Sequence, residues 1–186
     1  MDHEGYGRSS RTPGFSTIFD GVEEGSGRNR FAVFGSSSGA TRAGAFCNAC
    51  PERVERLATS AFPWTGKDAP SLIERRERLA KWQATNRRPV GPDYYRQMLT
   101  CDVEGLTEPT LGEAVAAAEL ANGNDSVPND TYVDMCIDLP LVDPTLITCP
   151  VSMIRAEHDG ITTDEDNAAF YARLNTKAKH FVMMSG

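Results

Sequence analysis

The stretch that decides the fold is FAVFGSSSGA, residues 31–40. Its first four residues are apolar, which is typical of a buried strand in a parallel sheet. The apolar run stops at Gly35, and an alanine-rich segment over residues 40–50 then predicts a helix packed tightly on that sheet. A buried strand that passes through a glycine-bounded turn into a helix of small residues indicates the α/β class.

The turn itself, residues 35–39, has the pattern G-x-S-x-G. In this pattern a nucleophilic serine stands on a strained strand-to-helix turn with its hydroxyl exposed, and the flanking glycines remove side chains that would clash there. The pattern predicts Ser37 as the nucleophile. It also predicts the backbone amide of Ser38, at the helix N-terminus, as an oxyanion-hole donor. The alternative is a glycine-rich turn without a catalytic role.

The rest of the sequence predicts alternating strands and helices toward both ends of the chain, but not in the middle. Residues 56–62, 150–155 and 180–184 predict three further strands, with a capped helix between the last two. Residues 63–148 predict helices and loops without a strand. The whole pattern predicts an α/β fold, with a parallel sheet, helices on both of its faces and a helical insertion.

A nucleophilic serine needs a base, and the base needs a carboxylate that orients it. Asp159 follows the predicted strand 150–155, and the carboxyl ends of parallel strands are where such sheets place functional groups. Asp159 is therefore the candidate catalytic acid. The alternative is an ordinary turn aspartate, because Asp159 is followed by Gly160 and Asp-Gly is a common turn pair.

Residues 31–62 and 149–186 resemble the α/β-hydrolase family. The resemblance rests on the strand, the G-x-S-x-G turn, the helix after it, and a late strand that ends in an aspartate. Residues 150–159 are similar to the family's segment P-x-L-x-x-x-G-x-x-D, although Ser152 and Ala156 stand where leucine and glycine are usual. The order of serine before aspartate also agrees with the family.

Residues 2–9, DHEGYGRS, also resemble the family's D-x-x-G-x-G-x-S loop. The resemblance then implies three parts: a core part with the nucleophile over residues 1–62, a helical cap over 63–148, and a core part with the acid loop over 149–186. It implies Ser-His-Asp hydrolysis of a carboxylic ester or related acyl substrate, with no cofactor. Carbon–carbon cleavage, perhydrolysis and aminopeptidase activity stay open, because the cap decides the substrate.

The same resemblance implies that the chain is truncated at both ends. In the family, three strands precede the loop of residues 2–9, and the catalytic histidine follows the last core strand. His3, His158 and His180 are interpreted as non-catalytic, since they fall in an N-terminal loop, beside Asp159 and inside a predicted strand. We therefore expect a fragment that lacks its histidine and has little activity alone. The alternative is a degenerate paralogue that acts, if at all, by binding.

Charge and hydropathy exclude several partners. The net charge of −7 and the pI of about 5.0 argue against nucleic-acid binding, which requires basic patches. The sequence has no apolar run near the roughly 20 residues of a membrane helix and no visible signal peptide. We expect a cytoplasmic protein whose partner is a small acyl substrate, with neither nucleic acid nor membrane; the oligomeric state is left open.

Five cysteines, at positions 47, 50, 101, 136 and 149, are predicted to be reduced thiols, because their number is odd and no secretion signal is visible. Cys47 and Cys50 form a C-x-x-C pattern. No second pair follows at zinc-site spacing, so no metal site is predicted. We interpret the two as small buried helix residues. A redox or metal protein built on them is the alternative.

Overall fold

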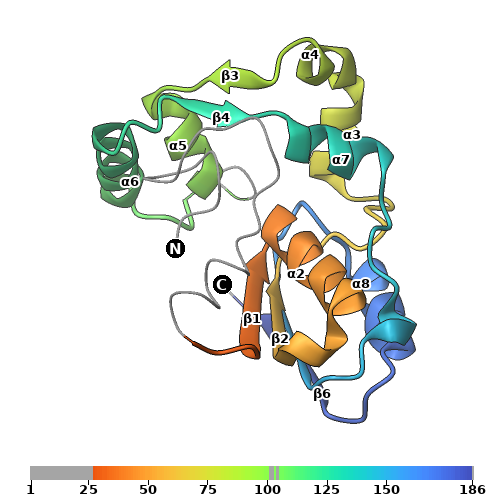
Figure 1. Ribbon diagram of the computed structural model, residues 1–186. Coiled ribbons are helices and arrows are strands. Elements are labelled where there is room, and N and C mark those ends of the chain that lie inside the picture. The colour runs from red at the N-terminus through yellow and green to blue at the C-terminus, as the bar shows by residue number, and fades with distance from the viewer. Residues whose placement is uncertain (1–26, 101–102, 104, 186) are drawn as a thin grey trace. The chain divides into compact units, whose positions relative to one another are not determined.

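The computed structural model describes residues 27–100, 103 and 105–185 (Figure 1). The chain divides into two compact units. The first, here called the sheet unit, comprises residues 29–80 and 131–186. The second, here called the middle unit, comprises the remaining described residues, chiefly 81–130. Every candidate site residue lies in the sheet unit.

The sheet unit is built on four parallel strands in the order β1-β2-β5-β6 (Figure 1). Their bounds are Phe31–Ser36 for β1, Val54–Ser60 for β2, Val151–Ala156 for β5 and Lys179–Met184 for β6. All four strands predicted from the apolar runs are confirmed, with ends that differ by one or two residues. The predicted α/β class is confirmed as well.

Two helices cover one face of this sheet. Helix α2 (Ser38–Ala49) connects β1 to β2, and α8 (Asp164–Arg173) connects β5 to β6. Both connections cross the sheet in the same direction, and since parallel crossovers are right-handed, both helices lie on the same face. Contact of the Tyr171 ring in α8 with Phe181 in β6 agrees with this arrangement, with centroids 6.2 Å apart.

Burial along the strands separates the two faces. Val33, Leu57 and Val151 lie side by side in register and are buried beneath the helices. On the opposite face Phe34 is 66% exposed and Val182 is 50% exposed. Helices were predicted on both faces; within the described residues the coverage by α2 and α8 falls on one.

Small side chains allow α2 to lie close to the sheet. Its buried positions are Ala40, Thr41, Ala43, Gly44 and Cys47. The alanine-rich composition that predicted this helix thus has a physical reason, since larger side chains at these positions would push the helix off the strands.

A short 3-10 turn, η1 (Pro51–Arg53), precedes β2. The other described elements lie between β2 and β5 in the chain. In order they are α3 (Pro70–Glu77), α4 (Leu79–Gln83), β3 (Arg87–Pro89), α5 (Pro92–Thr100), α6 (Pro109–Ala121), β4 (Ser126–Pro128), α7 (Asp130–Ile137) and the 3-10 turn η2 (Pro144–Leu146).

The prediction of no strand over residues 63–148 is wrong. Strands β3 and β4 pair antiparallel in the middle unit. Each is three residues long, too short for an alternating pattern to be visible in the sequence. The pair is held by side chains as well, since the Arg87 guanidinium donates to the backbone oxygen of Ser126 at 2.6 Å.

The compact units and the predicted parts divide the chain differently. Residues 63–80 and 131–148, assigned from the resemblance to a cap, group with the sheet rather than with the middle unit. The cap assignment for 63–148 stays a prediction. Within the described residues, no helix is long and apolar enough to cross a membrane.

Candidate active site

Ser37 lies between the last residue of β1 and the first residue of α2, and its backbone is strained. Its φ is 53° and its ψ is −124°. Residues with a side chain rarely adopt positive φ, and such strain costs on the order of 1–3 kcal/mol. The amide of Ser37 donates to the carbonyl oxygen of Ser60 at 2.9 Å, and its carbonyl accepts from the Ala40 amide at 2.9 Å. These bonds hold the turn in place.

The residues around Ser37 leave it room. Gly35 lies directly below the first turn of α2, where a β-carbon would overlap the backbone of Gly39 and Ala40. The helix can therefore begin immediately above the end of β1. Ser38 is the first residue of α2, so its amide has no partner one turn earlier in the helix. The first turn of α2 contains no acidic side chain, which leaves the positive end of the helix dipole available to an anion.

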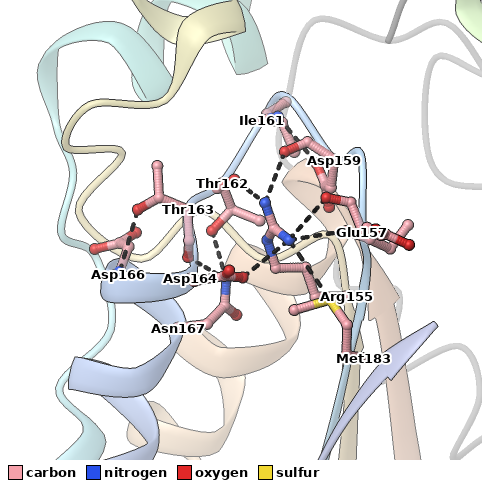
Figure 2. Close-up of polar contacts among 11 residues, drawn as sticks. Arg155, Glu157, Asp159, Ile161, Thr162, Thr163, Asp164, Asp166, Asn167 and Met183 are labelled. Atoms are coloured by element: carbon pink, nitrogen blue, oxygen red, sulfur yellow. Dashed lines mark hydrogen bonds and ion pairs between the residues drawn. The ribbon is translucent and has the colours of Figure 1, made fainter. Parts of the chain in front are cut away.

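Asp159 lies in the loop that joins β5 to α8, here called the acid loop, residues 157–163 (Figure 2). Its carboxylate Oδ1 accepts from the Ile161 amide at 2.9 Å, and its own amide donates to the Ala156 oxygen at 3.2 Å. The carbonyl of Gly160 accepts from the amide of Ser71 in α3 at 3.0 Å. The loop is therefore fixed both by internal bonds and by a helix outside it.

Arg155 is a residue of this region that sequence reasoning missed. It is 7% exposed, and Figure 2 shows its guanidinium within the acid loop. Nη1 donates to the oxygens of Ala156 at 2.9 Å and Glu157 at 3.3 Å, and Nη2 donates to those of Asp159 and Thr162, both at 3.2 Å. The sequence does contain a signal, because Arg155 occupies the same face of β5 as two apolar residues, Val151 and Met153.

The start of α8 confirms the helix cap predicted there. The hydroxyl of Thr163 accepts from the Asp166 amide at 3.2 Å. The side chain of Asp166 in turn accepts from the amides of Trp64, Thr65 and Gly66 at 3.0–3.2 Å. The segment that follows β2 is thereby tied to the helix that follows the acid loop.

The sheet register brings the two predicted site residues to the same edge. Ser36 lies opposite Ser60 in β2, and Ser60 lies opposite Ile154 in β5. Ser37 directly follows Ser36, and Asp159 lies in the loop that follows the last residue of β5, Ala156, so both lie beyond the carboxyl edge of the sheet, with β2 between their strands. Parallel sheets bind and transform ligands at this edge.

The histidines are placed differently. His180 is exposed and lies opposite Ser152, near the amino ends of the strands and away from Ser37. His158 is an exposed residue of the acid loop. His3, like the segment 2–9 that resembles a family loop, lies outside the described residues.

Comparison with known proteins gives a match at the level of structure. No family model matches the sequence, and no curated protein matches it. A monoacylglycerol lipase from Paleococcus ferrophilus superposes with a TM-score of 0.67 at 16% identity, covering 100% of this chain and 72% of that one. A thermophilic esterase from Thermogutta terrifontis gives 0.68 at 21% identity, covering 99% and 69%. An alpha/beta hydrolase enzyme, MGS-M2, from a Medee basin deep-sea metagenome library gives 0.60 at 15% identity, covering 99% and 69%.

The chain has a partial α/β-hydrolase fold. Identities of this size establish the fold alone. In the α/β-hydrolase fold the G-x-S-x-G turn carries a nucleophile on a strained strand-to-helix elbow, and the backbone at Ser37 has that geometry. The resemblance seen in the sequence is thus confirmed for the architecture, while the roles of Ser37, Ser38 and Asp159 stay predictions.

The C-x-x-C pattern lies at the carboxyl end of α2. Cys47 is buried in the helix, as predicted, but the same prediction for Cys50 is wrong, since Cys50 is only partly buried and lies just beyond the last residue of α2. The thiol of Cys47 hydrogen-bonds to Cys149. This bond and burial raise the pKa of Cys47, while the same bond lowers the pKa of Cys149 to about 7. Within the described residues, no group of three or more histidine, cysteine or acidic side chains could hold a metal.

Proposed function

We propose that the chain is part of a serine hydrolase that cleaves a carboxylic ester or a related acyl substrate, with Ser37 as nucleophile and Asp159 as the acid of a Ser-His-Asp triad. The observation that carries the proposal is the positive φ of Ser37 within a G-x-S-x-G turn at the carboxyl edge of a parallel sheet. Two similar structures are those of a monoacylglycerol lipase and an esterase, which supports the substrate class.

In the proposed mechanism the Ser37 hydroxyl oxygen attacks the substrate carbonyl carbon while a histidine accepts its proton. Asp159 orients that histidine and stabilises its protonated form. The Ser38 amide donates a hydrogen bond to the negative carbonyl oxygen that develops. The alcohol leaves with the proton from the histidine, and water then hydrolyses the acyl-serine by the same route.

The histidine is proposed to come from outside the described residues. His180 lies toward the amino end of β6, and His158 is exposed in the acid loop, so neither supports the role of base. Loss of the base from a triad lowers the rate by several orders of magnitude. The chain by itself is therefore proposed to have little esterase activity. The competing proposal is a catalytically inactive relative that acts by binding.

Free imidazole tests this proposal on the 186-residue chain, because it can supply the missing base. The probe is a fluorophosphonate: the Ser37 oxygen forms a bond to phosphorus, fluoride leaves, and imidazole takes the proton. We expect mass spectrometry to find slow labelling of Ser37 in buffer and labelling that rises with imidazole concentration.

Two variants serve as controls. Ser37→Ala must remove the adduct, and Asp159→Asn must reduce the imidazole-dependent part, because the aspartate orients the base. A folded chain that never labels at Ser37 would contradict the proposal. Rapid labelling without imidazole would support Ser37 as the nucleophile but would contradict the proposal that the 186-residue chain lacks a working base.

A further inference from the structure

Arg155 is a cation buried on the covered face of β5. Its side chain is 9% exposed, and Nη1 lies 3.6 Å from the sulfur of Met183 in the neighbouring strand. Burying a charged group is unfavourable unless hydrogen bonds and a counter-charge replace the lost water. The hydrogen-bond partners and the counter-charge of Arg155 therefore explain how a charged side chain can be buried at this position.

These partners belong almost entirely to the acid loop or its ends. Four backbone oxygens, of Ala156, Glu157, Asp159 and Thr162, accept from the two terminal nitrogens. The counter-charge is Asp164, the first residue of α8, at 2.9 Å; its side chain is 63% exposed. These four carbonyls thus point toward one guanidinium and hydrogen-bond to it instead of to water (Figure 2).

We propose that Arg155 is the positioning residue for Asp159. The inference rests on the proposed role of Asp159 as catalytic acid. Arg155 binds the backbone oxygen of Asp159 and that of Thr162, and the Ile161 amide between them donates to Asp159 Oδ1 at 2.9 Å. The guanidinium thus holds both sides of the segment whose amide orients the carboxylate.

Ile161 itself is anchored from the other side. Its side chain packs in a buried cluster with Ala69, Leu72 and Met135. The loop is therefore held between an apolar anchor and a buried cation. A shift of the guanidinium would move the Asp159 and Thr162 carbonyls relative to Ile161, and with them the direction of the carboxylate.

Lysine cannot replace arginine in this arrangement. A guanidinium has five donors in one plane and binds several carbonyls at once, whereas an ammonium is a compact point charge with three donors. Arg155→Lys keeps the charge and much of the length but is expected to lose the bonds from one of the two nitrogens. This substitution therefore separates the charge of Arg155 from its geometry.

The first readout is the Ile161 amide resonance in a ¹⁵N–¹H NMR spectrum, because that proton lies on Asp159 Oδ1. The Asp159→Asn variant serves as a reference, because it shows how far the Ile161 resonance shifts when its carboxylate acceptor is replaced. We expect Arg155→Lys to shift it as well, and Arg56→Lys, an exposed arginine on β2, to leave it unchanged. An unchanged Ile161 resonance in folded Arg155→Lys would overturn the inference.

The second readout is imidazole-dependent labelling of Ser37, measured as a double-mutant cycle. We expect Arg155→Lys to lower the labelling rate about tenfold, the scale of a small misplacement of a catalytic group. In the Asp159→Asn background the same substitution should change the rate less than about twofold, because the residue through which it acts is already disabled. An equal loss in both backgrounds would show a merely structural role and overturn the inference.

Asp164→Asn provides a second variant if Arg155→Lys fails to fold. It removes the counter-charge from an exposed position and leaves the carbonyl bonds, so we expect a smaller Ile161 shift in the same direction. No shift in this variant would then count against the inference. If the folded, unmodified chain never labels at Ser37, with or without imidazole, the proposed function fails, and the Ile161 resonance alone decides whether Arg155 positions Asp159.

Discussion

A β-carbon on Gly35 would lie 2.2 Å from the carbonyl oxygen of Gly39, far inside contact distance. A β-carbon on Gly39 would have no atom within 4 Å beyond its chain neighbours and the backbone of its own helix. The two glycines of the G-x-S-x-G turn therefore have different structural roles. The first lets α2 begin directly on the end of β1, and the second is not required by space.

This difference predicts opposite effects of alanine at the two positions. Gly35→Ala forces the first turn of α2 away from the strand and should lower the free energy of unfolding by about 3 kcal/mol. Gly39→Ala places alanine in a helix and should raise it by roughly 0.5–1 kcal/mol. Urea unfolding followed by circular dichroism measures both. Equal effects of the two substitutions would contradict the close approach at Gly35.

The positive φ of Ser37 predicts a stability gain from glycine. Ser37→Gly and Ser37→Ala both remove the hydroxyl and should both abolish labelling. Glycine adopts positive φ without strain, so Ser37→Gly should be more stable than Ser37→Ala by about 1 kcal/mol. Thermal unfolding of the two variants side by side is the measurement. A more stable alanine variant would show that the turn is unstrained.

The contact between Cys47 and Cys149 predicts a reactive thiol. Since the pKa of Cys149 is lowered to about 7, the thiolate fraction and the rate of alkylation by iodoacetamide should rise most steeply near pH 7. Cys47→Ala removes the donor that stabilises the thiolate, so the pKa of Cys149 should rise and the midpoint should move to higher pH.

Cys47→Ser is the matched control for this thiol, because its hydroxyl still donates and should keep the midpoint lower than alanine does. Peptide mass spectrometry separates Cys149 from the other cysteines. A midpoint that is identical in all three proteins would show that Cys47 does not stabilise the thiolate.

The carboxylate of Asp166 predicts a large loss of stability on truncation. It is buried and accepts from three successive amides, those of Trp64, Thr65 and Gly66, and from the Thr65 hydroxyl. Asp166→Ala leaves these donors without an acceptor and should cost about 3 kcal/mol or more. Glu165→Ala, at the neighbouring exposed position, should change stability by no more than about 0.5 kcal/mol. Similar losses in both variants would contradict the role of the carboxylate.

Much of the sheet and of the candidate nucleophile could be predicted because the signals are local. The run of residues 31–34 is apolar on both faces of a strand, and the turn at 35–39 needs glycine for reasons of space and dihedral angle that act within a few residues. By contrast, β3 and β4 are three residues each and form only by pairing with each other across a long stretch of sequence, so no local pattern predicts them. Asp159 could be predicted as a position after a strand, but not the bonds that hold its carboxylate.

The sequence by itself determined the α/β class, the strained turn at Ser37 and the place of Asp159 after a strand, because chain chemistry over fewer than about ten residues controls each of them. Only the tertiary structure decided that one strand, β2, lies between the strands of Ser37 and Asp159, that Arg155 lies within the acid loop and that Cys47 interacts with Cys149. The first of these relationships is set by the order β1-β2-β5-β6 and its register. The pairs Ser37–Asp159 and Cys47–Cys149 join residues far apart in the chain, whose spacing in sequence carries no information about their distance in space. The bonds of Arg155 are close in sequence, but they depend on how the acid loop folds back around the guanidinium.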